Sequence, residues 1–210
     1  MRPLMRILLL IVAVTISALP IYSQESKTKQ DSKAPVDPPP PAVEYNPNAW
    51  KEYSSQQGRF TIMFPGTPTE AAGRLEGRRF MLKTTAVYAV YYTDFPASFP
   101  YDLEKEVSLR KQFLDASRDT TLAQSKGKVL SETDISLEGH PGRMMKIALP
   151  DGTITREKTY VVGKRIYQII VVTRGELLAP DGGRFDETRA TKFLDSFKLA
   201  RPENNEDGKR

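Results

Sequence analysis

The sequence contains no cysteine. Without cysteine there is no disulfide, no thiolate metal site and no cysteine nucleophile, so core burial alone must hold the fold together. The same absence excludes a lipoprotein, whose mature N-terminus is a lipid-modified cysteine. The residues left after an N-terminal signal and a linker number about 150, which is enough for one domain with its own core.

Histidine is almost as scarce, because His140 is the single one. A pair of histidine ligands or a zincin helix is therefore excluded within one chain. His140 lies in the run Gly139-His140-Pro141-Gly142, which is typical of a turn, and no Gly-x-Ser-x-Gly elbow accompanies it. We expect His140 to serve turn geometry, and we predict no catalytic residue, no cofactor and no metal.

One acidic loop needs separate treatment, because Asp181-Gly182-Gly183-Arg184-Phe185-Asp186-Glu187 places three carboxylates around two glycines. A calcium loop alternates oxygen ligands and closes with a distant glutamate. Phe185 interrupts that alternation, and Asp186 is better placed as a helix cap. The loop therefore does not predict a calcium site.

Charge of one sign is not concentrated anywhere in the chain. The net charge is +5, and the loss of Arg2 and Arg6 with a signal segment would leave +3. The basic residues are scattered among acidic ones, whereas nucleic-acid binders gather them on one face with aromatic residues between. We predict no nucleic-acid partner.

Long hydrophobic runs are also missing, with one short exception at the N-terminus. Arg2 and Arg6 precede an apolar run that starts at Ile7 and ends before Pro20. A membrane-spanning helix needs roughly 20 apolar residues, so this run is typical of a secretory signal. We predict cleavage between Ser23 and Gln24, no stable transmembrane anchor afterwards, and a periplasmic or secreted protein.

Residues 24–47 and 201–210 lack the apolar side chains that a core needs. The first segment is polar and then proline-rich through Pro38-Pro39-Pro40-Pro41, which favours an extended spacer. A ligand for a proline-binding domain is the alternative, but the flanks lack a basic PxxP pattern. We predict a signal peptide over 1–23, a disordered linker over 24–47, a domain over 48–200 and a disordered tail over 201–210.

The domain reads mainly as β-strands. Residues 60–64 alternate apolar and other side chains and end at a Pro-Gly turn, as a half-buried strand does. Residues 79–94 are apolar on both alternating sets, which predicts one strand covered on both faces. The later strands are predicted at 129–137, 143–149, 153–162 and 165–172. Short glycine-bearing turns separate these strands, so we expect an antiparallel meander.

Two helices complete the predicted fold. The first should span 103–117 with Asp102 as N-cap, and its core-facing side includes Leu103, Val107 and Leu114. The second should span 187–197 with Asp186 as cap, and its apolar stripe should dock on the sheet. That stripe is Ala190, Phe193, Leu194 and Phe197. The fold class is therefore α+β, an antiparallel meander flanked by two main helices.

Three segments carry a resemblance to a known family. They are Trp50-x-x-Tyr53, the run Gly58-Arg59-Phe60-Thr61-Ile62-Met63-Phe64-Pro65, and Phe193-Leu194-Asp195-Ser196-Phe197. Together with the central hairpins, these segments resemble the PsbP-like superfamily over residues 48–200. Its fold is shared by photosystem II PsbP and by the Ran-binding Mog protein. The resemblance implies an α/β/α sandwich that acts by binding, and it transfers no functional residue.

Glu106 and Arg110 form the first candidate site. They are four residues apart with the acid on the N-terminal side, the favourable order for a helical ion pair. They also lie in the middle of the predicted core-facing arc, so we expect a buried pair. The pair either pins the helix to the sheet, which we favour because buried pairs are common structural elements, or forms a site at the helix–sheet junction.

Phe95, Phe99 and Tyr101 form the second candidate site. They surround a loop with two prolines between a strand and the first helix. Aromatic loop residues can form a partner surface, which makes these three the candidate binding site. Alternatively, Phe95 and Phe99 cap the core, and we favour this because the prolines suggest a fixed crossing.

These observations favour an exported, noncatalytic binding or assembly module of the cell envelope, whose partner is another envelope protein. The alternatives are a carboxylate-dependent hydrolase and a carrier of an apolar ligand. A buried carboxylate pair facing a cleft would favour the hydrolase. A continuous apolar cavity inside a curved sheet would favour the carrier.

Overall fold

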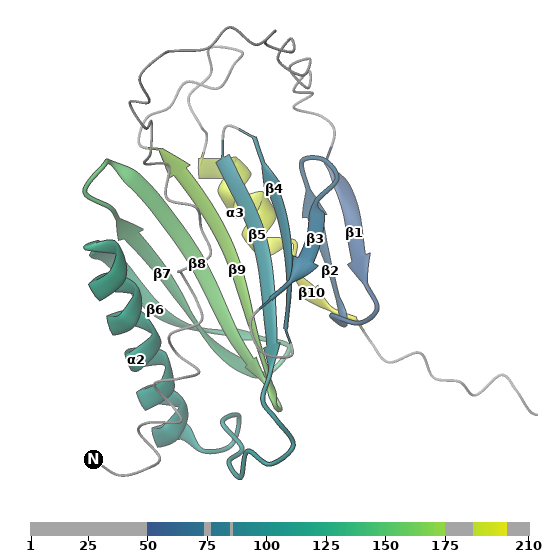
Figure 1. Cartoon of the computed structure of the whole chain (residues 1–210), viewed down its shortest axis with the longest axis vertical. Helices are drawn as coiled ribbons and strands as arrows, with labels where there is room; N and C mark the ends of the chain where they lie inside the picture. The colour runs from purple at the N-terminus through teal and green to yellow at the C-terminus, as the bar shows by residue number, and fades with distance from the viewer. Residues whose placement is uncertain (1–49, 74–76, 85, 175–186, 201–210) are drawn as a thin grey trace, which may run out of the picture.

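The computed structural model describes residues 50–73, 77–84, 86–174 and 187–200 (Figure 1). The predicted signal segment, the proline-rich linker, the tail and residues 181–186 lie outside the described residues. Within them the chain forms two antiparallel sheets and two helices, one on each face of the larger sheet. The α+β prediction is confirmed.

The larger sheet has seven strands in the order β3-β4-β5-β9-β8-β7-β6. Every neighbouring pair is antiparallel, and the predicted meander from β6 to β9 is confirmed. The strands are β3 (Thr69–Ala72), β4 (Arg78–Lys83), β5 (Ala86–Asp94), β6 (Lys128–Leu137), β7 (His140–Ala148), β8 (Thr153–Val162) and β9 (Arg165–Arg174). The β4–β5 hairpin and the β8–β9 hairpin therefore meet where β5 pairs with β9.

The single strand predicted over 79–94 is wrong, because the chain turns between β4 and β5. The two strands pair with each other, and Phe80 lies opposite Val90. The turn is closed by Thr84, whose amide and hydroxyl both donate to the carbonyl oxygen of Ala86. No described residue of this turn is a glycine or proline, so the β-branched and aromatic pattern continues through it and hides it in the sequence.

The turn predicted around His140 is shorter than expected. Glu138 and Gly139 alone make the connection between β6 and β7, both with positive φ (52° and 88°), which is the two-residue turn that favours glycine. His140 and Gly142 therefore belong to β7. Gly142 is required there by close packing, since a Cβ would lie 2.4 Å from the carbonyl oxygen of Thr159.

A second, three-stranded sheet with the order β1-β2-β10 was not predicted. It comprises β1 (Lys51–Ser55), β2 (Phe60–Phe64) and β10 (Lys198–Leu199). Helix α3 (Glu187–Asp195) is shorter than predicted and ends before Phe197. Its predicted apolar stripe is nevertheless fully buried, which confirms the docking of this segment.

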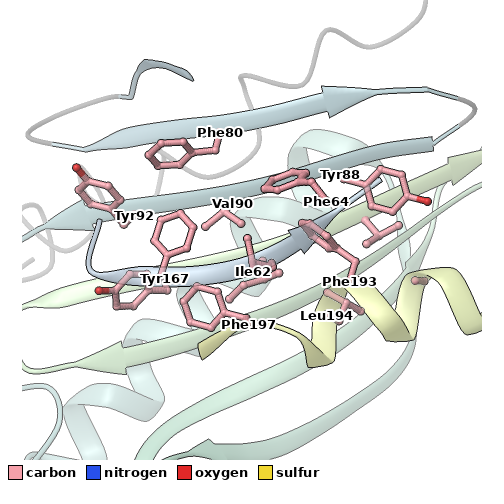
Figure 2. Close-up of a cluster of buried hydrophobic side chains, with 14 of the residues drawn as sticks. Ile62, Phe64, Phe80, Tyr88, Val90, Tyr92, Tyr167, Phe193, Leu194 and Phe197 are labelled. Carbon is pink, nitrogen blue, oxygen red and sulfur yellow. The ribbon is translucent and has the colours of Figure 1, made fainter. Parts of the chain in front are cut away.

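The main core lies between the larger sheet on one side and the small sheet with α3 on the other. Phe64 contacts Phe193 edge to face with ring centroids 5.0 Å apart, and the two side chains lie side by side in Figure 2. Phe64 also contacts Tyr53 edge to face, at 6.0 Å. Phe197 packs against Phe60 in the same layer, 5.5 Å away. The residues of this layer that Figure 2 labels are Ile62, Phe64, Phe80, Tyr88, Val90, Tyr92, Tyr167, Phe193, Leu194 and Phe197.

Helix α2 (Val107–Ser125) covers the opposite face of the larger sheet, and it starts and ends later than the predicted 103–117. Asp102 caps a separate turn before the helix, because its Oδ1 accepts from the amides of Glu104 and Lys105. Val107 is 64% exposed, so its predicted place in the core is wrong. The helix continues past Ser117 to Ser125, and it ends at the left-handed cap Lys126, whose φ is 53°. Neither helix in the described ranges is long and apolar enough to cross a membrane.

Candidate functional site

Phe95, Phe99 and Tyr101 do not form the predicted partner surface. Phe95 and Phe99 are each 6% exposed, and their rings stack with centroids 4.5 Å apart. They belong to a second core under the start of α2, and Tyr101 packs against it half-buried. The other buried members of that core are Leu103, Phe113, Leu114, Val161 and Ile166. The surface interpretation is wrong, and the core-cap interpretation is correct.

Glu106 and Arg110 do not form the predicted buried ion pair. Glu106 is exposed, and its Oε1 accepts from the amide of Asp102 at 3.2 Å. Arg110 is half-buried, and its guanidinium donates to the carbonyl oxygens of Leu103 and Glu104 at 3.2 and 2.5 Å. Because the helix begins at Val107, the two residues do not occupy one helical face. Arg110 instead closes the turn that leads into α2.

His140 has a specific partner that its sequence context did not reveal. Its Nδ1 lies 2.7 Å from Oε1 of Glu104, and both side chains are less than one third exposed. The other carboxylate oxygen of Glu104 accepts from the amide of Gly163. These contacts link the turn before α2 to the start of β7 and to the β8–β9 turn, so the group fastens one end of the sheet.

No group of three or more histidine and carboxylate side chains in the described ranges could hold a metal ion. The acidic segment around Asp181 lies outside those ranges. The acidic residues that the structure does bring together are engaged by arginines instead.

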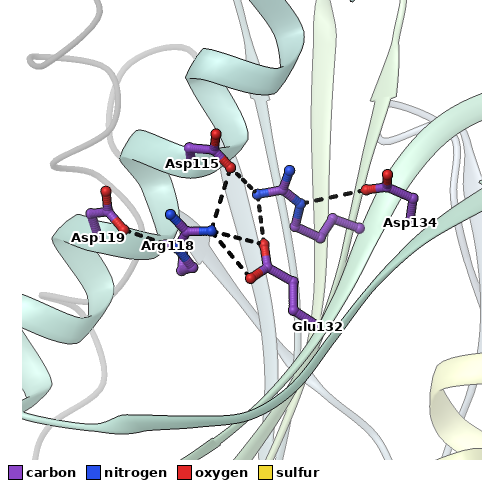
Figure 3. A network of polar contacts seen from close by, with 6 residues as sticks. Asp115, Arg118, Asp119, Glu132 and Asp134 are labelled. Atoms are coloured by element: carbon purple, nitrogen blue, oxygen red, sulfur yellow. Dashed lines mark hydrogen bonds and ion pairs between the residues drawn. The ribbon is translucent and has the colours of Figure 1, made fainter.

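The largest such network joins α2 to β6 and β7 (Figure 3). Arg118 of α2 contacts Asp119 at 2.9 Å and Glu132 at 3.2 Å, and it also reaches Asp115. Arg143 of β7 lies within 2.8 Å of both Asp115 and Glu132. Charge-assisted hydrogen bonds of this kind fix the helix against the sheet.

The network has an excess of carboxylates. Asp134 is its fourth acid, 3.7 Å from Nε of Arg143 and 89% exposed, whereas the Arg143 side chain is only 7% exposed. Asp119 is 66% exposed. The two guanidiniums are thus surrounded by four carboxylates, and the charge left over lies on the outer side, where α2 and β6 meet solvent.

One carboxyl group is buried beneath α2 without a cation. Glu157 of β8 is 1% exposed, and its Oε1 accepts from Thr159 and Gln168, each at 2.8 Å. Its Oε2 is buried with no hydrogen-bond partner. Burial raises the pKa of Glu157, and the two hydrogen bonds only partly oppose that shift. The group is suited to storing a proton, but no second carboxylate is among its described hydrogen-bond partners.

The candidate site is the β6 edge of the larger sheet, which is longer than the β3 edge at the other end. β6 is a ten-residue strand that pairs with β7 on one side only, at the end of the strand order. Most of its residues are exposed, including Leu130 at 50%. An edge strand presents backbone groups to which another strand can add. We take β6, with the exposed acids beside it, as the candidate functional site.

Sequence reasoning did not identify this edge, although one signal was present. Residues 128–137 carry charged and hydroxyl side chains on both alternating sets, which favours an edge strand. The signal was weak, because the interior strand β8 carries the same pattern. The signal for Glu157 was weaker. Glu157 alternates along β8 with Thr155, Thr159 and Val161, so these four side chains share one face of the strand. Whether that face is buried depends on where α2 docks.

No protein-family model matches the chain, and no curated protein matches its sequence. Several solved structures are similar to it, and three of them are described below. The solution structure of cyanobacterial PsbP (CyanoP) from Synechocystis sp. PCC 6803 has 11% identity and a TM-score of 0.47, over 79% of this chain and 99% of that chain. A crystal structure of a Pseudomonas aeruginosa protein of unknown function has 12% identity and a TM-score of 0.35, over 64% of this chain and 86% of that chain.

The third similar structure, from Bacteroides thetaiotaomicron VPI-5482, has 14% identity and a TM-score of 0.35, over 74% of this chain and 50% of that chain. At these identities and TM-scores, no residue role is taken from any of the three.

Proposed function

We propose that this protein is an exported, noncatalytic binding or assembly module of the cell envelope. A signal segment ending at Ser23 would direct it to the periplasm or to secretion, and its partner would be another envelope protein. The observation that carries the proposal is the exposed edge strand β6, which leaves one side of a ten-residue strand available for pairing.

The polar contacts of the domain support binding over catalysis. Arg165 holds Asp94 through two hydrogen bonds of 2.6 Å each, and it also donates to the carbonyl oxygen of Gly58. Glu104 and His140 are likewise engaged in fastening turns. These groups join elements of the fold, which is a structural task, whereas a general acid or base must reach a substrate.

The two alternatives find less support. A carboxylate-dependent hydrolase requires a pair of acids around its substrate. Glu157, the best buried acid of the described ranges, has hydroxyl and amide partners. A carrier requires an apolar cavity, whereas the layer next to α3 is filled by rings in mutual contact, such as Tyr88 against Phe193 at 5.2 Å. Membership of the PsbP-like superfamily is part of the proposal, and kinship with the Ran-binding Mog protein stays a prediction.

Site-specific photo-cross-linking in the native envelope tests the proposal. A photoreactive residue at Thr133 on the β6 edge should capture a partner that mass spectrometry identifies. The matched control is the same residue at Glu52, an exposed position on β1, which is the edge strand of the small sheet. Capture from Thr133 but not from Glu52 is the expected result. Equal capture from both positions, or none from any position of β6, would contradict the proposal.

A further inference from the structure

The backbone of β6 offers a regular pairing site over part of its length. A register shift between Val129 and Ser131 marks a bulge at Leu130, so the regular stretch is Ser131–Leu137. The two-residue turn makes Leu137 and His140 a hydrogen-bonded pair. From there, hydrogen-bonded and non-hydrogen-bonded residue pairs alternate along the two antiparallel strands. The amide and carbonyl groups of alternate residues therefore point outward.

The outward-pointing residues are Glu132, Asp134 and Ser136. The pairing of Ser136 agrees with this assignment, because it lies opposite Pro141, which has no N–H to donate. Glu132 and Asp134 lie opposite Met145 and Arg143, on the face that α2 covers. A strand added to this edge would thus receive its hydrogen bonds at Ser136 and at the two acidic residues.

The charge around these positions is negative. Asp134 is 89% exposed, and its only described cationic contact is the 3.7 Å approach to Arg143. Asp119 on α2 adds a carboxylate that is 66% exposed, and Glu138 in the adjoining turn is exposed as well. The cation on the strand itself, Lys128, lies on the far side of the bulge. A protein with a net charge of +5 thus carries a local acidic edge.

We infer that the β6 edge binds an extended segment of another polypeptide that carries lysine or arginine at alternate positions. The inference rests on the proposed function and deepens it by naming the chemistry of the partner. The basic side chains would lie on the face of Glu132 and Asp134, where opposite charges across a strand pair attract. The residues between them would lie beside Thr133 and Ile135, which suits threonine, valine or isoleucine.

A second copy of this chain fits the edge poorly. Antiparallel pairing of two β6 strands about Thr133 would place Glu132 of each copy opposite Asp134 of the other. Pairing about Asp134 would place the two Asp134 carboxylates face to face. Like charges directly opposite each other destabilise a strand pair. The charge pattern therefore favours a different, basic chain.

A blocked synthetic peptide in which lysine alternates with threonine and valine is the probe. It is titrated into the full chain, and amide hydrogen exchange is followed residue by residue. We expect slower exchange at Glu132, Asp134 and Ser136, and weaker binding as salt rises. The same peptide with glutamate in place of lysine should leave those amides unprotected. Equal protection by both peptides, or protection by neither, would overturn the inference.

Two variants separate the charge from the backbone. Asp134→Asn keeps the strand and should weaken lysine-peptide binding by about two- to fivefold. Ser136→Pro keeps the charge but removes one outward N–H, and it should weaken binding by about tenfold while the β6–β7 ladder is retained. Glu52→Gln removes an exposed acid from β1 and should change nothing. Equal affinity of Asp134→Asn and wild type would contradict the charge argument.

The two levels of proposal fail in different ways. If photo-cross-linking from Thr133 captures a partner but the lysine peptide does not protect the edge, the inferred partner chemistry is wrong and the binding module stands. If photo-cross-linking captures no partner at β6 and the lysine peptide does not protect the edge, both the proposed function and the inferred partner chemistry are wrong. Circular dichroism of each variant provides the check that it is folded.

Discussion

The two faces of the large sheet bury different chemistry. Along β9, Tyr167 and Ile169 point toward α3 and the small sheet, whereas Gln168 between them points toward α2. The first face is mainly an aromatic and aliphatic layer, and the buried polar residues on it are Arg156, Arg165 and Thr173. The second buries polar groups between its apolar residues. These buried polar residues are Ser117, Thr121, Arg143, Thr155, Glu157, Thr159 and Gln168.

This difference assigns a separate task to each face: the α3 face mainly stabilises the fold, and the α2 face positions the proposed binding edge. Aromatic side chains bury the most apolar area, and the larger cluster lies on the α3 face, so this face supplies most of the hydrophobic stabilisation. A face with buried polar groups gains less for the same area, since each group needs a partner. On the α2 face those groups instead fix the position of α2 beside β6. That position sets the acids that flank the proposed binding edge.

Truncating the aromatic layer should give the largest effect. Phe197 is 2% exposed and packs against the rings of Phe60, Tyr160 and Tyr167. Phe197→Ala should lower the free energy of unfolding by roughly 3 to 5 kcal/mol, measured by chemical denaturation. Leu130→Ala, at an exposed position of β6, is the control and should change it by less than about 0.5 kcal/mol. A neutral Phe197→Ala would contradict the division between the faces.

The next largest effect concerns the ion pair of Arg165 with Asp94 on the aromatic face. Arg165 is 6% exposed, binds Asp94 with two hydrogen bonds, and lies 4.3 Å from the centroid of the Tyr92 ring. Arg165→Met keeps the packing volume but leaves Asp94 without its cation, so it should cost about 3 kcal/mol. The double variant with Asp94→Leu should recover part of that loss in a double-mutant cycle. No recovery would mean that the carbonyl contacts of Arg165 matter more than the ion pair.

On the α2 face the corresponding change should stabilise the protein. Glu157→Gln keeps the oxygen that accepts from Thr159 and Gln168 and removes the charge. Because the wild-type carboxyl group is buried without a cation, removing its charge should raise the free energy of unfolding at pH 8 by on the order of 1 kcal/mol. Thermal unfolding at several pH values measures it.

The pH dependence gives the sign of this effect. Burial raises the pKa of Glu157 in the folded state above its ordinary value of about 4.3. Below that ordinary value both states are protonated and the variant gains nothing. As the pH rises, the unfolded state loses its proton first, so wild-type stability falls until the folded pKa is passed. A gain of Glu157→Gln that is the same at pH 3 and pH 8 would show that packing is responsible.

Much of the fold could be predicted because its signals are local. The alternation in residues 60–64 and the stripe of Phe193 and Leu194 each need only the periodicity of one element. The β4–β5 turn could not be predicted, since Thr84 closes it with a side-chain hydrogen bond and its described residues include no glycine or proline. The small sheet was missed because β10 has only two residues and pairs with β2, a strand far from it in the sequence.

The candidate sites were harder to predict because they depend on where elements begin and meet. Glu106 and Arg110 share a helical face only if the helix starts before them, and the Asp102 turn moves that start to Val107. The contact between His140 and Glu104 joins two residues that are far apart in the sequence, so no local pattern predicts it. The exposure of β6 follows from strand order, which is a property of the whole sheet.

The smallest expected effect comes from the ion pair that fastens α3. Glu187 binds Arg156 through both carboxylate oxygens and also contacts Lys146. The hydrogen bond to Arg156 lowers the pKa of Glu187 despite the opposing effect of burial. Its contribution is therefore present above the ordinary glutamate pKa of about 4.3 and is lost as the pH falls through the folded value.

Glu187→Gln should cost only about 0.5 kcal/mol at pH 7, because the carboxylate is 57% exposed and solvent screens the pair. In acid the two proteins should unfold at the same temperature, since the wild-type glutamate is then neutral too. This slope is opposite to that of Glu157, so one pH series of melting temperatures on both variants separates the two faces of the sheet. A cost of Glu187→Gln that persists at pH 2 would assign the effect to lost packing of α3.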